Sequence, residues 1–163
     1  MKGKVQVIDP HDAGHRPLNL TQPVFSEEAL ARADRALEAM GGSFEKWLDA
    51  DIAKLQAAKA AAAAAGWSDA ALDALWRAAH DLKGMGGTYG YPLVTRLAAS
   101  LCRLTETEAG KRAARGNPML VSAHIDGLRA AVRDRIASDD HPVGRALVQA
   151  LEAQVSQLGV APR

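Results

Sequence analysis

The stretch "RAAHDLKGMGGTYGYP", residues 77–92, decides how the fold is read, because it first continues a helix and then ends it. The sequence before it is rich in Ala and Leu, whereas Gly84, Gly86 and Gly87 follow closely after His80. Each glycine inside a helix costs about 1 kcal/mol relative to alanine. Because alanine would stabilise this helix better, three glycines beside the histidine indicate a specific requirement for positions without side chains.

The composition favours helices. The chain has 163 residues, enough for one domain with its own core, and 48% of them are hydrophobic but only 4% aromatic. Strands draw on β-branched and aromatic residues, so this Ala- and Leu-rich composition points away from a sheet. The 20 Lys and Arg against 19 Asp and Glu give no basic excess for nucleic acid. Cys102 is the single cysteine, which excludes an internal disulfide and a Cys-based zinc site.

Helix signals recur along most of the chain. Residues 1–22 carry prolines and glycines without a helical period and read as a tail or arm, and residues 23–160 read as the helical domain. Glycine, proline and polar residues separate the segments, and "AGKRAARGNP" (109–118) reads as a basic loop. Three helices are predicted from Ser26 to about Met40, from Ser43 to Gly66 and from Ser68 to about Gly90. Three more are predicted from the apolar stripes Leu93–Leu104, Val121–Ile136 and Val143–Leu158.

These segments predict an all-α fold, an antiparallel four-helix bundle with additional flanking helices. The sequence has no apolar run of about 18 residues and no signal-peptide pattern. We therefore expect a cytoplasmic protein that contacts neither membrane nor nucleic acid, and we expect it to be a monomer.

The helix that holds His80 has a clear phase. At about 100° per residue, its apolar positions form one stripe, and His80 lies roughly 130° from the middle of it. His80 should therefore face solvent, with Arg77 and Gly84 on the same outer side. Gly87 also lies on the outer side, and Trp76 and Lys83 flank His80 between core and solvent. The core stripe consists of Leu72, Leu75, Ala79, Leu82, Gly86 and Tyr89.

This arrangement favours a nucleophilic imidazole. No His, Cys or carboxylate lies four residues before or after His80, so the spacing predicts no metal site. Asp81 is adjacent in sequence but points elsewhere on the helix, so no carboxylate orients the ring as a general base. A neutral imidazole is available near neutrality to attack a phosphoryl group, and Lys83 could neutralise the charge that arrives. Without side chains, Gly84 and Gly87 would let another protein reach the ring.

The segment "HDLKGMGGTYG", His80 to Gly90, resembles the signature of histidine phosphotransfer (Hpt) domains. Met85 departs from that signature because it is larger than the usual Ser or Ala, and we expect it on the flank of the core. The resemblance implies that His80 accepts a phosphoryl group on Nε2 from a receiver-domain aspartate and passes it to another receiver. Lys83 would lie near the phosphoryl oxygens, and Arg77 could support the same charge.

The resemblance also implies the partners. They would be response-regulator receiver domains and a hybrid histidine kinase, and the receiver alone would supply magnesium. The chain itself would need no cofactor and would be a carrier, not an enzyme, since nothing in it resembles an ATP-binding kinase domain. Two alternatives stay open: a helical docking module that is not phosphorylated, and, more weakly, a phosphatase that uses Asp81.

Other polar residues receive structural interpretations. His124 is predicted to be semi-buried, His141 to open the last helix, and Cys102 to be a small buried hydrophobe. His11 and His15 are spaced by four residues but stand among Pro and Gly, so no metal site is expected from them. Around His80, the docking surface is predicted from Trp76, Gly84, Gly87 and Val94.

Overall fold

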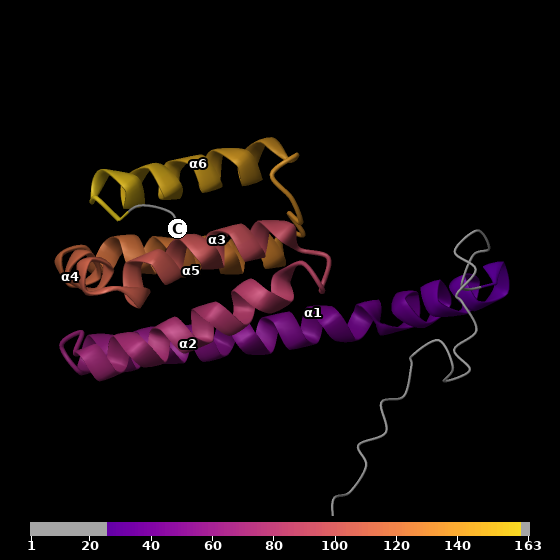
Figure 1. Cartoon of the computed structure of the whole chain (residues 1–163), viewed down its shortest axis with the longest axis horizontal. Helices are drawn as coiled ribbons and strands as arrows, with labels where there is room; N and C mark the ends of the chain where they lie inside the picture. Colours follow the sequence, from indigo (N-terminus) through magenta and orange to yellow (C-terminus); the bar gives the residue numbers. More distant parts are fainter. Residues whose placement is uncertain (1–25, 161–163) are drawn as a thin grey trace, which may run out of the picture. The chain divides into compact units, whose positions relative to one another are not determined.

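The structure, a computed structural model, describes residues 26–160, and the side chains of residues 37–42 are excluded from that description. Every regular element in this range is a helix, which confirms the predicted all-α class (Figure 1). The helices are α1 (Glu27–Ala64), α2 (Asp69–Gly86), α3 (Pro92–Glu106), α4 (Glu108–Gly116), α5 (Pro118–Arg133) and α6 (Pro142–Gln157).

The chain divides into two compact units, Met1–Ala39 and Met40–Arg163. In the first unit, the described residues form the start of α1, where Ser26 Oγ accepts a hydrogen bond from the backbone N–H of Ala29 at 3.2 Å. Ser26 is therefore the N-cap that its position before two glutamates predicts. The predicted tail, residues 1–22, lies outside the described residues, and the predicted domain boundary at residue 23 stays a prediction.

The Met40–Arg163 unit is an antiparallel bundle with α3 at its centre. α3 packs against α2, α4, α5 and α6. The Met40–Ala64 part of α1 runs beside α2 (Figure 1) and contributes Leu48, Ile52 and Leu55 to the shared core. α6 packs against α5 as well as α3, and α4 also contacts α5.

The predicted break at Gly41–Gly42 is wrong, because α1 continues through both glycines to Ala64. Glycine lowers helix propensity by about 1 kcal/mol per residue but does not forbid helical dihedral angles. The alanine-rich residues 57–64 form the last turns of the same helix, so this stretch is not a flexible linker. Although α1 is long, no helix in the described part of the chain is also apolar enough to cross a membrane.

The predicted loop at residues 109–118 is also wrong, because most of it forms α4. Thr107 caps this helix, since its Oγ1 accepts a hydrogen bond from the backbone N–H of Gly110 at 3.0 Å. Lys111 is buried, and its ammonium lies 2.7 Å from Oδ1 of Asp73 on α2. The ion pair raises the pKa of Lys111 and ties α4 to the helix that carries His80.

The buried face of α6 is rotated from the predicted stripe. Val143 and Leu158, predicted in the stripe, are 58% and 38% exposed, whereas Gly144 and Val148 are buried. A side chain at Gly144 would place its Cβ 2.6 Å from the carbonyl oxygen of Ser138. Gly144 thus lets α6 approach the backbone at Ser138 closely, and a pattern of apolar residues alone does not indicate this contact.

Candidate functional site

His80 projects from α2 into solvent, as its helical phase predicts. The opposite face of the helix carries Leu75, Ala79 and Leu82, whose side chains have no exposed surface. Burial of this stripe fixes the rotation of α2 about its axis and therefore the direction of the imidazole. Among the described residues, no hydrogen bond or ion pair engages the His80 ring, so its nitrogen atoms are available to a partner.

Trp76 lies one turn before His80 and touches it. The two ring centroids are 5.0 Å apart, with the ring planes tilted by 38°. Trp76 is half-buried and packs against the hydrophobic core, which matches its predicted place between core and solvent. The indole therefore covers the N-terminal side of the imidazole.

The C-terminal side of His80 is bare. A Cβ added at Gly84 would meet no atom within 4 Å, and one added at Gly87 would meet only Oγ1 of Thr95, at 3.8 Å. Both glycines are exposed, as predicted. Open space of this kind would let the surface of another protein approach the imidazole closely.

Gly86 has a different role, because it faces inward. A Cβ at this position would lie 2.7 Å from Oγ1 and 2.8 Å from the backbone nitrogen of Thr95 on α3. Real side chains do not tolerate such distances, so Gly86, which was predicted on the core stripe, permits close packing of α2 on α3. The same threonine accepts a hydrogen bond from the backbone N–H of Gly87 at 2.9 Å.

A capping turn stops the helix directly after these glycines. Gly90 has φ +79°, in the left-handed region, and its N–H donates to the carbonyl of Gly87 at 3.1 Å. The N–H of Tyr91 donates to the carbonyl of Gly86 at 2.8 Å. These two hydrogen bonds form a Schellman motif, which requires the positive φ that Gly90 supplies. The motif and the Thr95 contact fix the backbone of the glycine segment.

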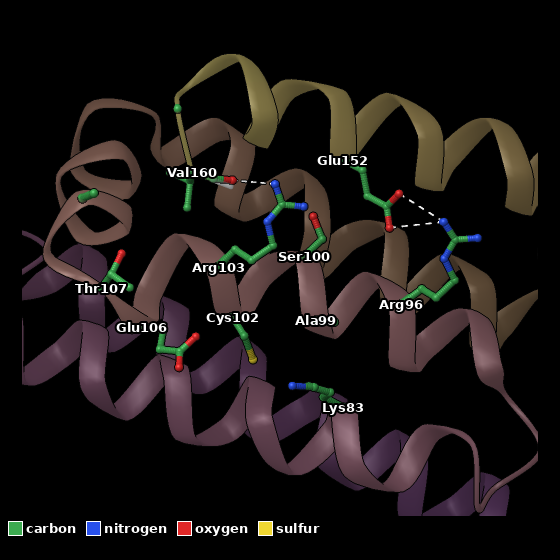
Figure 2. A pocket seen from close by; sticks show the side chains of 12 residues that line it. Lys83, Arg96, Ala99, Ser100, Cys102, Arg103, Glu106, Thr107, Glu152 and Val160 are labelled. Carbon is green, nitrogen blue, oxygen red and sulfur yellow. Dashed lines mark hydrogen bonds and ion pairs between the residues drawn. The ribbon is translucent and has the colours of Figure 1, made fainter. Parts of the chain in front are cut away.

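Charged side chains lie on both sides of the histidine. Arg77, Asp81 and Lys83 are all exposed. Lys83 borders a groove of about 480 Å³ along α3, and Figure 2 shows its side chain pointing into this groove toward Cys102. The exposed Lys83 ammonium carries a positive charge that an arriving anion would meet.

The other histidines and the cysteine have structural surroundings. His124 is fully buried and hydrogen-bonded to Ser100, more buried than predicted, and the Nδ1 of His141 accepts from the N–H of Val143 at the start of α6. Burial raises the pKa of the Cys102 thiol to about 11, as expected of a buried hydrophobe and not of a nucleophile. The described residues contain no cluster of three or more potential metal ligands, and the predictions for residues 11 and 15 lie outside that range.

Two predictions beside His80 need correction. Val94, predicted on the docking surface, is fully buried, because the start of α3 turns it toward the core. Met85, predicted on the flank of the core, is 37% exposed and lies outside the core cluster. The structure also adds Thr95, which sequence reasoning missed because its contacts with α2 depend on tertiary packing alone.

The structure thus places His80, Arg77, Lys83, Gly84 and Gly87 on the exposed side of α2, with Trp76 against the ring. Their functional roles stay predictions. Neither a curated protein nor a solved structure matches this chain. The family model of the Hpt domain, however, matches residues 25–159, a range that contains all six helices. The chain therefore belongs to the Hpt domain family.

Proposed function

We propose that this protein is a phosphorelay intermediate that accepts a phosphoryl group on Nε2 of His80 and passes it on. The donor would be an aspartyl phosphate on a receiver domain, and the acceptor an aspartate on another receiver. The single observation that carries the proposal is the exposed, unengaged imidazole with open space over Gly84 and Gly87. Membership of the Hpt domain family supports the same reaction class.

Phosphoryl transfer from an aspartyl phosphate requires only a nucleophilic nitrogen and nearby positive charge from the carrier. The lone pair of Nε2 attacks phosphorus, an Nε2–P bond forms, and the bond from phosphorus to the aspartate oxygen breaks. The carboxylate leaves with its electron pair and needs no proton, while the imidazole proton stays on Nδ1. Lys83 and Arg77 would balance charge on the phosphoryl oxygens, and the receiver would supply the magnesium. On this proposal the protein is a carrier with no catalytic domain of its own.

The partners would be response-regulator receivers and the receiver of a hybrid histidine kinase. A docking module that is not phosphorylated is the alternative, and a phosphatase that uses Asp81 is a weaker one. Incubation with a ³²P-labelled receiver separates these functions. A carrier gains acid-labile, base-stable label, a docking module gains none, and a phosphatase releases inorganic phosphate without becoming labelled.

His80→Gln tests the acceptor directly. The variant should lose all acid-labile label and keep its helical content, because the side chain at position 80 faces solvent and holds no core contact. Circular dichroism and receiver-to-carrier transfer are the two measurements. If acid-labile label persists in His80→Gln, another residue is the acceptor and the assignment of His80 is refuted.

Gly87→Leu tests access to the ring. Its Cβ would meet only an ordinary contact with Thr95, so the variant should fold, while the added side chain should block receiver-dependent transfer. Gly116→Leu is the matched control, because a Cβ there meets no atom within 4 Å and α4 follows the far end of α3. Transfer by Gly87→Leu at the wild-type rate would refute the access role of the glycines.

A further inference from the structure

The contact between Trp76 and His80 has a geometry that restrains the imidazole. A helical side chain leans toward the residue four positions before it, and on α2 that residue is Trp76. The ring centroids are 5.0 Å apart and the planes are tilted, within the range of attractive aromatic pairs. The imidazole thus rests against a large, half-buried surface on one side and has open space over Gly84 on the other.

Packing alone does not account for a tryptophan at this position. The indole Nε1 of Trp76 is buried, and no acceptor of the described chain hydrogen-bonds to it. A buried donor without a partner lowers stability, and Leu or Phe would fill the position without that cost. The indole ring nevertheless lies against the His80 ring, with the two centroids 5.0 Å apart. The position therefore favours a wide aromatic face at the expense of an unsatisfied N–H group.

We propose that Trp76 is a positioning residue for phosphorylation: its indole holds the His80 imidazole in one rotamer, with Nε2 presented toward the open side over Gly84 and Gly87. The inference rests on the proposed function, since it concerns how His80 meets its phosphoryl donor. Trp76 itself transfers no proton and touches no phosphorus. It acts by reducing the number of orientations that the nucleophile samples.

The size of the effect follows from the rotamers that it removes. A histidine on an exposed helix has about two accessible χ1 wells, and its ring has about two orientations in χ2. Restriction to one productive orientation should therefore speed phosphorylation about two- to fourfold. This increase in rate should not depend on the phosphoryl donor, because the imidazole is already ordered in the free carrier.

A small donor separates positioning from docking. Phosphoramidate can phosphorylate an exposed imidazole without a partner protein: the Nε2–P bond forms, the P–N bond of the donor breaks, and ammonia leaves. We expect Trp76→Leu to react about two- to fourfold more slowly than wild type with phosphoramidate. Trp76→Phe should retain at least half of the wild-type rate and be no less stable in urea, because it keeps an aromatic face and removes the unpaired N–H.

Trp47→Leu is the matched control. Trp47 is also a half-exposed tryptophan, but its ring contacts are with Phe44 and Tyr89 and not with His80. Its phosphoramidate rate should equal that of wild type. Scalar couplings of the His80 β protons should report one dominant χ1 rotamer in wild type and an average over rotamers in Trp76→Leu, a readout that a purely structural role would not change.

The outcomes are distinct. An unchanged phosphoramidate rate in Trp76→Leu overturns the inference, and a loss confined to receiver-dependent transfer overturns it as well, making Trp76 a docking contact. A wild-type chain that accepts no phosphoryl group even from phosphoramidate also overturns it. Wild type that reacts with phosphoramidate but with no receiver refutes the proposed function, while the comparison of the Trp76 variants still decides the positioning role.

Discussion

Among single residues, Lys83 offers a test of charge at the site. It follows His80 by one helical turn, and the i, i+3 spacing makes the two side chains neighbours on α2. A phosphorylated side chain carries about two negative charges. An exposed ion pair contributes about 0.2–1 kcal/mol, so Lys83→Ala should shorten the phosphohistidine lifetime by up to about fivefold at low salt. Its stability in urea should match that of wild type.

Charge, not geometry, should be what matters at position 83. Lys83→Arg should therefore behave like wild type, and the deficit of Lys83→Ala should shrink at high salt because salt screens exposed charges. Arg77, one turn before His80 and also exposed, can replace part of the lost charge. Equal lifetimes for Lys83→Ala and wild type at low salt would reduce Lys83 to a solvated surface residue.

His124 gives a second prediction for a single residue, on pH. The Nδ1–H donates to the carbonyl of Leu120 at 2.8 Å, and in the neutral ring Nε2 accepts a hydrogen bond from the Ser100 hydroxyl, 2.9 Å away. Burial lowers the pKa of His124 below its ordinary 6.5. Below pH 6.5 the unfolded chain therefore binds more protons than the folded one, and the free energy of unfolding falls as the pH drops toward the folded pKa.

The slope from this group is at most about 1.4 kcal/mol per pH unit. Urea unfolding between about pH 7.5 and pH 5 measures it, with His124→Asn as the comparison. The asparagine amide can still donate to Leu120 but does not titrate, so the variant should lose less stability on acidification even though it starts less stable. Parallel pH profiles for the two proteins would exclude His124 as a source of acid sensitivity.

The single helices show where sequence reasoning succeeds and where it fails. The phase of α2 could be predicted because Leu72, Leu75 and Leu82 form one unambiguous stripe, and this stripe places His80 outside. Features that depend on tertiary contacts could not be predicted. The nine-residue α4 is too short to show a period, and it is held by the Lys111–Asp73 ion pair between helices. Val94 was misplaced for a similar reason, since only the packing of α3 buries it.

Two glycines of α2 provide a matched test of that packing. Gly86→Ala would force a Cβ to within 2.7 Å of Thr95 Oγ1 and 2.8 Å of its backbone nitrogen, so it should destabilise the protein by about 1–3 kcal/mol. Gly84→Ala meets no atom within 4 Å, so the better helix propensity of alanine should stabilise by up to about 1 kcal/mol. Urea midpoints at constant slope report both changes. Equal shifts in the same direction would show that Gly86 is not a packing glycine.

In the whole molecule, core and site belong to the same unit. Every buried hydrophobic residue of the described chain lies between Leu48 and Val160, and the residues around His80 lie on α2 within that span. The compact unit Met40–Arg163 thus holds both the hydrophobic surface that stabilises the bundle and the exposed face that carries the proposed chemistry. Neither should require the residues that precede Met40.

A chain that begins at Met40 tests this independence. In that chain Ser43 can cap the shortened first helix, with Glu45 in its first turn, as the sequence pattern at this point suggests. Because Leu48, Ile52 and Leu55 are retained, the shortened protein should unfold in one cooperative urea transition and accept a phosphoryl group on His80 at the full-length rate. The full-length protein is the control for both measurements. A broad, non-cooperative transition would mean that the residues before Met40 contribute to the bundle, and cooperative unfolding with slow phosphorylation would instead give those residues a part in presenting His80 to its donor.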